Sequence, residues 1–235
     1  MPGKSTWGRS SGRDNLAKPP NAALRRGLKL RMGVLSLTAV TELQVAFAES
    51  AEVVLEDIRA SYWSEFGDHC SDVAFAGSGD AGAVCRALLM FDLSGVPPTV
   101  TSAILRVEIE SFWSTAPEEC FVVHDVIDSD IDALLNGDDS LAIFDDLGDG
   151  AFYSDEICVT EADEGSIIEI LLLQPAVDDI NGSTTGYLSI GTRLTTLDGS
   201  KEPLNLEGVR FGTGDPSLWT NELVLTFQPQ VLRCW

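Results

Sequence analysis

Apolar and polar residues alternate along several stretches of the chain after residue 49. Residues 103, 105, 107 and 109 are apolar, whereas Arg106, Glu108 and Glu110 occupy alternate positions. Because successive side chains of a strand point to opposite faces, this pattern predicts a strand with one buried face. The same alternation at residues 89, 91 and 93 predicts another strand just before it. Further strands are predicted at residues 52–58, 71–76, 121–126, 156–159, 166–173, 186–193, 208–212 and 222–227.

Turn residues and two short helical segments separate these strands. Gly, Pro, Asn and Asp cluster at residues 76–82, 95–99, 136–140 and 196–203. One helix is predicted at residues 129–135, with Asp128 or Ser129 as its N-cap, and another at 174–181, with Pro175 in its first turn. We therefore predict an all-β fold, a two-sheet antiparallel β-sandwich of jelly-roll type with one or two short surface helices.

The first 48 residues differ from the rest of the chain. Residues 25–48 contain a basic start, a short apolar run and a small-x-small end, which together predict a secretory signal peptide cleaved after Ala48. The alternative is a disordered basic tail on a cytosolic protein. After this leader we predict one β-sandwich domain, residues 49–228, and a C-terminal tail, residues 229–235. No later segment reaches the roughly 18 apolar residues of a membrane-spanning helix.

Charge is distributed unevenly between the leader and the body. Residues 1–48 contain eight basic and two acidic residues, which leaves seven basic and 35 acidic residues, a charge of −28, for the body. A body this acidic repels phosphate backbones and anionic membrane surfaces, so we expect no nucleic-acid partner. The acidic residues serve either solubility or the binding of divalent cations, which favour oxygen ligands.

The five cysteines show no spacing typical of a zinc site. Export would make disulfides the expected state. We predict one disulfide between Cys70 and Cys85, which flank a Gly-rich segment, and another between Cys120 and Cys158, each beside a predicted strand. Cys234 is left over. The alternative is that all five are free thiols.

One stretch of the chain resembles a known family. Residues 86–109, RALLMFDLSGVPPTVTSAILRVEI, resemble the core motif of DNRLRE-type β-sandwich modules: an Arg-led strand ending in Phe-Asp-Leu-Ser, a Pro-containing turn and a strand opening with Thr-Ser-Ala. Residues 123–154, 166–199 and 220–227 are similar in order and spacing to secreted bacterial proteins that often carry a PEP-CTERM sorting tail. The Val-Pro-Glu-Pro motif of that tail is missing, so we expect either a released protein or one whose tail was lost.

This resemblance implies an exported jelly-roll-like protein, usually of no assigned activity. Related modules occur as carbohydrate-binding or surface-attached parts of larger proteins, in some cases with a structural calcium. Asp92 of the Phe-Asp-Leu-Ser motif is expected to accept hydrogen bonds from turn amides before Gly95 rather than to bind metal.

An acidic segment offers candidate calcium ligands. Alternate acids can converge on one ion, as they do in calcium-binding loops. The alternative is a solvated loop in which Asp128 caps a helix. The candidate ligands are Asp125, Asp128, Asp130 and Asp132, and a second acidic group contains Asp145, Asp146 and Asp149.

Aromatic residues near strand ends suggest a carbohydrate-binding surface, because a pyranose face stacks on an exposed ring. The alternative is that these rings belong to the core. The predicted carbohydrate-binding residues are Tyr62, Trp63, Trp113 and Trp219, with Phe66, Phe112 and Tyr153 as further aromatic candidates.

No catalytic residues are predicted. His69 and His124 have no glycine-framed Ser or Cys near them in the sequence, so a nucleophilic triad has nothing to assemble around. We expect an exported, non-enzymatic protein of the cell surface or extracellular matrix that binds polysaccharide. Two alternatives are a structural or adhesive protein without a small ligand and, as an outsider, a polysaccharide-degrading enzyme that uses paired carboxylates.

Overall fold

The fold is described from a computed structural model of the chain. The predicted leader, Asp128, Trp219, Cys234 and the predicted C-terminal tail lie outside the described residues. The described residues are 50–70, 73–79, 82–97, 99–127, 129–197, 207–212 and 221–228.

The strands account for most of the regular structure, as the alternation predicts. They are β1 (Ala51–Ser64), β2 (His69–Cys70), β3 (Ala74–Ser78), β4 (Val84–Asp92), β5 (Val100–Trp113), β6 (Glu119–Asp125), β7 (Ile157–Val159), β8 (Ile167–Leu171), β9 (Tyr187–Leu194), β10 (Glu207–Phe211) and β11 (Glu222–Phe227). The helices are α1 (Ile131–Asn136), α2 (Leu141–Asp146), the short 3-10 helix η2 (Glu161–Asp163) and α3 (Gln174–Gly182).

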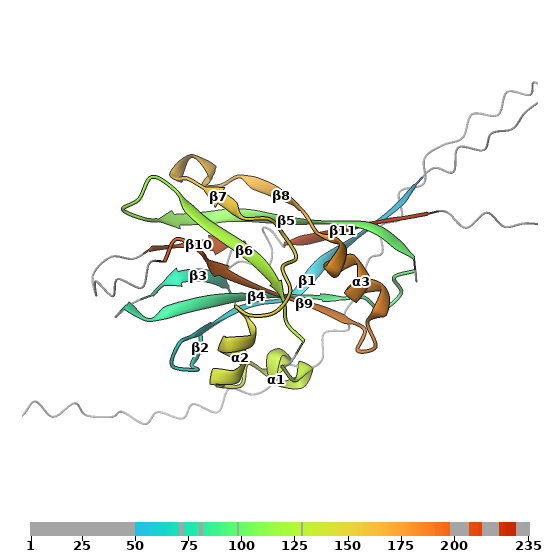
Figure 1. The fold of residues 1–235 in the computed structure, drawn as a ribbon, viewed down its shortest axis with the longest axis horizontal. Coiled ribbons are helices and arrows are strands. Elements are labelled where there is room, and N and C mark those ends of the chain that lie inside the picture. Colours follow the sequence, from blue (N-terminus) through green and yellow to red (C-terminus); the bar gives the residue numbers. More distant parts are fainter. Residues whose placement is uncertain are drawn as a thin grey trace, which may run out of the picture.

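The strands pair antiparallel throughout and form a sandwich-like arrangement of two sheets (Figure 1). Sheet A contains the first half of β1, then β11, β5 and β8. Sheet B contains β2, the second half of β1, β4, β9, β6 and β7, and β3 and β10 connect it back to β5. The prediction of an all-β, antiparallel, sandwich-like fold is confirmed.

Two long strands form the corners of the sandwich. β1 pairs with β11 up to Glu56, and after a bulge between Asp57 and Arg59 it pairs with β4. β5 pairs with β11 in its first half and with β10 in its second, again across a bulge. Bulged strands that change sheets are a usual way to build such corners. Asp57 lies at one corner, where burial raises the pKa of its carboxyl to about 6 and the charge of Glu56 adds to the effect.

The main core lies between the sheets. It consists of the inward residues of both sheets, and three buried residues of α3, Ala176, Val177 and Ile180, extend it. In β5 the inward residues are the ones that the alternation predicts, because Ala103, Leu105, Val107 and Ile109 are all buried.

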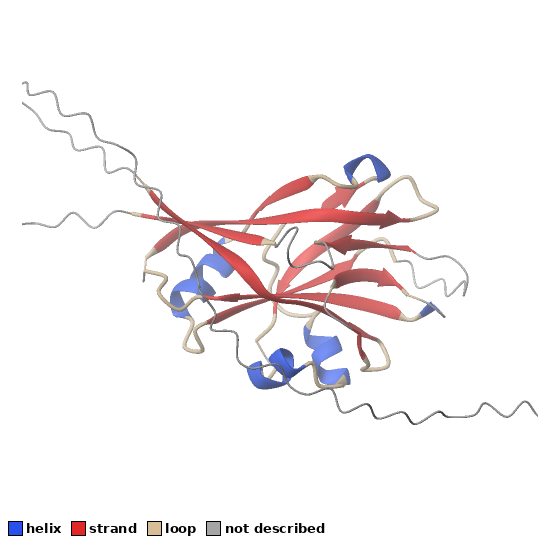
Figure 2. Cartoon of the chain, turned by 180° about the vertical axis from the view of Figure 1, so that it is seen from behind, coloured by secondary structure: helices blue, strands red, loops and turns tan. Residues whose placement is uncertain are grey.

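A second apolar cluster lies on the outer face of sheet B. We call α1, α2 and their connections the outer layer; Figure 2 shows these two helices together on one side of the strands, apart from α3. The residues of the cluster are Trp63, Leu88, Met90, Val126, Leu134, Ile143, Phe144 and Leu147. The backbone of Leu147 comes so close to β9 that a Cβ on Gly191 would lie 2.4 Å from its carbonyl oxygen. Gly191 therefore allows the outer layer to reach the sheet.

Local signals define the helices of the outer layer. Asp130 is the N-cap of α1 and accepts from the backbone N–H groups of Asp132 and Ala133, so the predicted cap at Asp128 or Ser129 is wrong. Gly137 ends α1 in the left-handed conformation, with φ of 70°, which favours glycine. α2, which the sequence pattern does not predict, begins after Ser140, whose hydroxyl accepts from the backbone N–H of Ile143.

The outer face of sheet A carries two parallel stripes of side chains. The apolar stripe consists of cross-strand partners on four neighbouring strands: Val54, Val224, Ile104 and Leu171. The charged stripe, two residues along each strand, consists of Glu56, Glu222, Arg106 and Glu169. Arg106 forms ion pairs with Glu169 at 2.8 Å and with Glu222 at 3.4 Å.

The first and last strands of the domain are neighbours. Ala51 at the start of β1 pairs with Phe227 at the end of β11 (Figure 1). Among the described residues, none of the helices is long and apolar enough to cross a membrane.

Candidate functional site

The four predicted carbohydrate-binding residues do not share one environment. Trp63 is fully buried in the outer-layer cluster and its Nε1 donates to the carbonyl oxygen of Asp138 at 3.0 Å. The prediction that Trp63 forms an exposed platform is therefore wrong. Trp219 lies outside the described residues. The structure brings Tyr62 and Trp113 together through a third ring, that of Phe75.

These three rings form what we call the aromatic row: Tyr62 on β1, Phe75 on β3 and Trp113 at the end of β5. The centroid of the Phe75 ring lies 5.6 Å from that of Tyr62 and 5.8 Å from that of Trp113. Both contacts are edge-to-face, a favourable arrangement for aromatic pairs. Phe75 is buried, Tyr62 is half-buried, and Trp113 is 38% exposed. The exposed surface of the row is therefore mainly the indole of Trp113.

Phe75, which holds the row together, is not among the predicted platform residues. Its ring lies over Gly208 of β10, where an added Cβ would meet it at 2.4 Å. Gly208 is also the cross-strand partner of Trp113. An added Cβ on Gly77, two residues further along β3, would also meet this ring at 2.9 Å, so glycines leave the room that the ring occupies.

Charged residues border the aromatic row. The Nε of Arg210 lies 2.5 Å from Oε2 of Glu110, and the Arg210 charge also acts on Tyr62. Burial raises the pKa of Glu110; Arg210 opposes this shift, whereas the charges of Glu108 and Glu164 add to it. The charge of Arg210 is thus balanced by Glu110, and Glu108 and Glu164 add negative charge close to this pair.

Two cysteines lie beside the Tyr62 end of the row. Cys70 is the cross-strand partner of Tyr62 and is half-buried, whereas Cys85 is buried. The pKa of Tyr62 is raised to about 12, mainly by burial and also by the neighbouring thiols of Cys70 and Cys85. Burial also raises the pKa of Cys85 to about 12, so this thiol is a weak nucleophile at neutral pH.

Cys70 and Cys85 are free thiols, so the predicted disulfide between them is wrong. β1 lies between them, because Cys70 pairs with Tyr62 on β1 and Cys85 pairs with Ser64 on the same strand. Two strand spacings amount to roughly 9.6 Å, whereas a disulfide joins Cα atoms less than about 7 Å apart.

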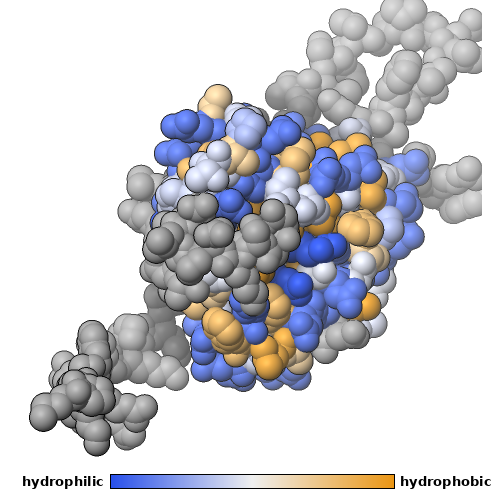
Figure 3. Space-filling view, turned by 60° about the vertical axis from the view of Figure 1, so that its left-hand side comes forward, coloured by the Kyte–Doolittle hydropathy of each residue, from blue (hydrophilic) through white to orange (hydrophobic). Residues whose placement is uncertain are grey.

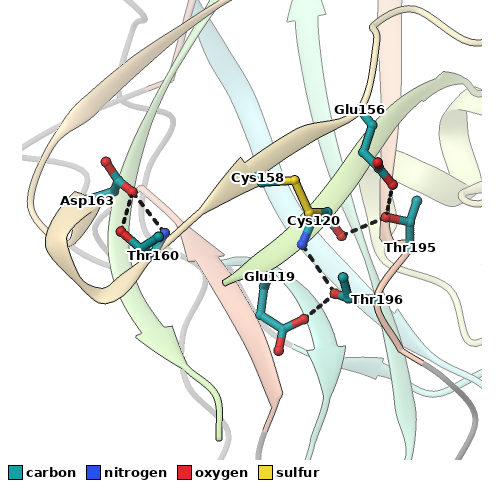
Figure 4. The surroundings of a disulfide bond; sticks show 8 residues. All are labelled: Glu119, Cys120, Glu156, Cys158, Thr160, Asp163, Thr195 and Thr196. Carbon is teal, nitrogen blue, oxygen red and sulfur yellow. Dashed lines mark hydrogen bonds between the residues drawn. A yellow bond between two sulfur atoms is a disulfide. The ribbon is translucent and has the colours of Figure 1, made fainter. Parts of the chain in front are cut away.

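The predicted disulfide between Cys120 and Cys158 is confirmed. These residues face each other across β6 and β7, with Cα atoms 4.0 Å apart (Figure 4). Threonine hydroxyls beside the disulfide donate to two carboxylates: Thr196 to Glu119, and Thr195 to Glu156 at 2.5 Å. The disulfide and these hydrogen bonds fasten the edge strand β7 and the end of β9 to β6.

The three predicted calcium ligands that the structure describes do not converge. Asp125 is buried and accepts from the backbone N–H of Ala151 at 2.8 Å, Asp130 caps α1, and Asp132 is exposed in the first turn of that helix. Within the described residues, the one group of three metal-ligating side chains contains the disulfide itself and Glu156. The described members of the predicted ligand set therefore serve local structure. Asp92 does likewise, accepting from the Ser94 backbone N–H at 2.7 Å, as predicted.

Both histidines contact arginine. The Nε2 of His69 lies 3.0 Å from a guanidinium nitrogen of Arg59, and the Nε2 of His124 accepts from Nε of Arg193 at 3.1 Å. His124 lies under the outer layer, where burial lowers its pKa to about 4 and the charges of Arg193 and Arg86 act in the same direction.

No protein-family model matches the chain, and no curated protein matches it. Any assignment of function therefore depends on the sequence and on the geometry described above.

Proposed function

We propose that this chain is an exported, non-enzymatic β-sandwich protein of the cell surface or extracellular matrix that binds polysaccharide through the aromatic row. The observation that carries the proposal is the partly exposed indole of Trp113, which Phe75 supports edge-on. An indole whose orientation is fixed by packing offers a flat surface for the apolar face of a pyranose at little cost in side-chain entropy. The hydroxyls of the sugar would meet the carboxylates and the guanidinium at the border of the row.

Two features support export and a non-enzymatic role. The leader has the pattern of a signal peptide, and a cross-strand disulfide is typical of proteins from oxidising compartments. Nε2 of each histidine lies within hydrogen-bond distance of an arginine side chain, which favours a structural role for both rings. Membership of the DNRLRE-type modules remains part of the proposal; the all-β fold and residues 86–109 support it.

The second candidate function is structural or adhesive. The apolar stripe on sheet A favours it, because Val54 and Leu171 at its two ends are exposed, and exposed apolar surface is where protein contacts form. In Figure 3, by contrast, the side on which β3 and β10 lie carries its apolar surface in several separate patches among polar residues.

Affinity electrophoresis of the secreted protein in gels containing a panel of neutral and acidic polysaccharides tests the proposal. We expect retardation by at least one polysaccharide and an at least tenfold loss of affinity in Trp113→Ala. Phe66→Ala is the matched control, because Phe66 is 68% exposed but is not part of the aromatic row. Retardation by no polysaccharide, or equal retardation of Trp113→Ala, would remove the function and leave the adhesive candidate.

A further inference from the structure

We propose that the aromatic row selects uncharged polysaccharides and rejects anionic ones, a selectivity set by the Arg210–Glu110 ion pair. This inference rests on the proposed function and names its ligand class. Acidic exopolysaccharides are an obvious alternative ligand for a protein at a cell surface, so the charges at the row decide between two distinct classes.

Acidic side chains outnumber basic ones beside the described part of the aromatic row. Arg210 is the cation that the described residues place at the row, and its Nε lies 2.5 Å from Oε2 of Glu110. Glu108 and Glu164 act on Glu110 as further negative charges, so the carboxylate of this ion pair lies among other acidic side chains. Arg210 and Glu110 are both half-buried, which keeps their pair less screened by salt than an exposed pair.

Anionic and uncharged polysaccharides would meet different conditions at the aromatic row. A carboxylate or sulfate on a sugar would have to separate Arg210 from Glu110 and would still lie near Glu108 and Glu164. An uncharged sugar hydroxyl, in contrast, can donate to these carboxylates without disturbing the ion pair. The charge of −28 on the body adds repulsion over a Debye length, about 10 Å at 0.1 M salt.

The accessibility of Cys70 can report where a glycan lies on the aromatic row. Cys70 faces Tyr62 across the β1–β2 pairing and is half-buried, whereas Cys85 is only 3% exposed. A glycan chain that extends along the row from Trp113 to Tyr62 would cover Cys70. Alkylation of Cys70 by a maleimide is therefore a readout of ligand position that does not depend on Trp113.

The experiment uses one polymer in two charge states. The neutral polysaccharide that retards the secreted protein most is oxidised at its primary hydroxyls to carboxylates, which keeps the backbone. We expect affinity to fall at least tenfold at high oxidation, and to recover in part at 0.5 M salt. We also expect the neutral form, but not the oxidised form, to slow alkylation of Cys70 at least threefold in a Cys234→Ser background.

Two variants distinguish the ion pair from overall charge. Glu110→Gln releases Arg210 and should raise affinity for the oxidised polymer at least threefold. Glu52→Gln removes the same charge from an exposed position at the start of β1 and should leave that affinity unchanged. An equal gain in both variants would assign the selectivity to net charge and overturn the role of the ion pair.

Failure of this inference is distinct from failure of the function. Equal or tighter binding of the oxidised polymer, still abolished in Trp113→Ala, would overturn the selectivity while the binding function stands. If no polysaccharide retards the protein, both fall together.

Discussion

The outer faces of the two sheets are treated differently. Sheet B is covered by the outer layer, so Trp63, Leu88 and Met90 are fully buried on a face that points away from the main core. Sheet A has no such cover among the described residues, and Glu169 and Leu171 are exposed on its outer face. The same sandwich thus contains one sheet whose strands β4, β6 and β9 are buried on both faces and one sheet that is buried mainly on its inner face.

The residue pattern of the strands reflects whether their outer face is covered. β5 in sheet A alternates between buried and more exposed positions, whereas β6 in sheet B is buried along its whole length. Strands buried on both faces form continuous apolar runs, and half-exposed strands alternate. A run such as Ala87 to Phe91 in β4 therefore indicates that another layer covers the strand.

Among the single substitutions that test this difference between the sheets, Trp63→Ala should cause the largest loss of stability. Removing a fully buried indole from the outer-layer cluster should lower the free energy of unfolding by about 4 kcal/mol. Leu171→Ala, on the uncovered face of sheet A, is the control and should change it by less than about 0.5 kcal/mol. Urea denaturation followed by circular dichroism measures both. Similar losses in the two variants would contradict the difference between the faces.

Removing the disulfide tests how the edge strands of the two sheets are attached. β7 at the edge of sheet B is linked covalently to β6, whereas β8 at the edge of sheet A is attached to β5 by backbone pairing. The double substitution Cys120→Ala with Cys158→Ala should lower the free energy of unfolding by about 4 kcal/mol, because the unfolded chain is no longer closed into a loop with a sequence separation of 38. Cys70→Ala is the control. A loss under about 1 kcal/mol would show that hydrogen bonds alone secure β7.

Protonation of His124, which lies under the outer layer, should lower the free energy of unfolding in acid. Its pKa lies at about 4 in the folded state, below its usual value of 6.5, so the unfolded state binds a proton first as the pH falls. Stability is therefore lost between pH 6.5 and pH 4, by about 3 kcal/mol. His124→Gln should abolish this component while it retains an acceptor for Arg193. If parent and variant kept a constant difference across this range, His124 would not be the titrating group.

Asp57, at the corner between the sheets, should respond to acid in the opposite direction. Its pKa lies at about 6 in the folded state, above its usual value of 3.8, so the folded state binds the proton more tightly and gains stability as the pH falls through this range. Asp57→Asn should stabilise the protein by about 3 kcal/mol above pH 6 and by little at pH 4. Glu52→Gln, which removes an exposed acidic side chain from the same strand, is the control. A pH-independent effect of Asp57→Asn would contradict this account.

The smallest expected effect concerns the charged stripe of sheet A. Arg106 contacts Glu169 and Glu222 at the surface, and such ion pairs contribute at most about 1 kcal/mol. Arg106→Gln should therefore cost about 0.5 kcal/mol at low salt and nothing measurable in 1 M salt. The comparison of unfolding midpoints at the two salt concentrations measures it, and a loss that persists in high salt would point to packing instead.

Strand positions could be predicted from the sequence because alternation has a direct physical cause. β11 has the predicted bounds, and β5 and β9 lie close to theirs. α2 escapes prediction because its six residues are too short for a helical period to show, and it is stabilised by its contacts with sheet B. Trp63 could not be distinguished from a platform residue without knowing that a further layer covers its face.

Side-chain pairings depend on strand order, which residue patterns do not specify. Cys120 and Cys158 could be paired correctly, because their strands are neighbours. The same reasoning fails for Cys70 and Cys85, because β1 separates their strands. The aromatic row is a further case: Tyr62 and Trp113 are visible in the sequence, whereas their contact through Phe75 follows from the way β3 and β10 close the sheet.

The pairing of Ala51 with Phe227 determines how this domain can be built into larger molecules. Entry and exit of the chain share one place, so the domain could be inserted into a loop of a host protein, or circularly permuted with a short linker, without strain on the sheets. Tyr62 lies eleven residues along β1 from Ala51, or roughly 35 Å at the rise of a strand. A host protein or anchor joined beside Ala51 and Phe227 would therefore lie at the far end of β1 from Tyr62.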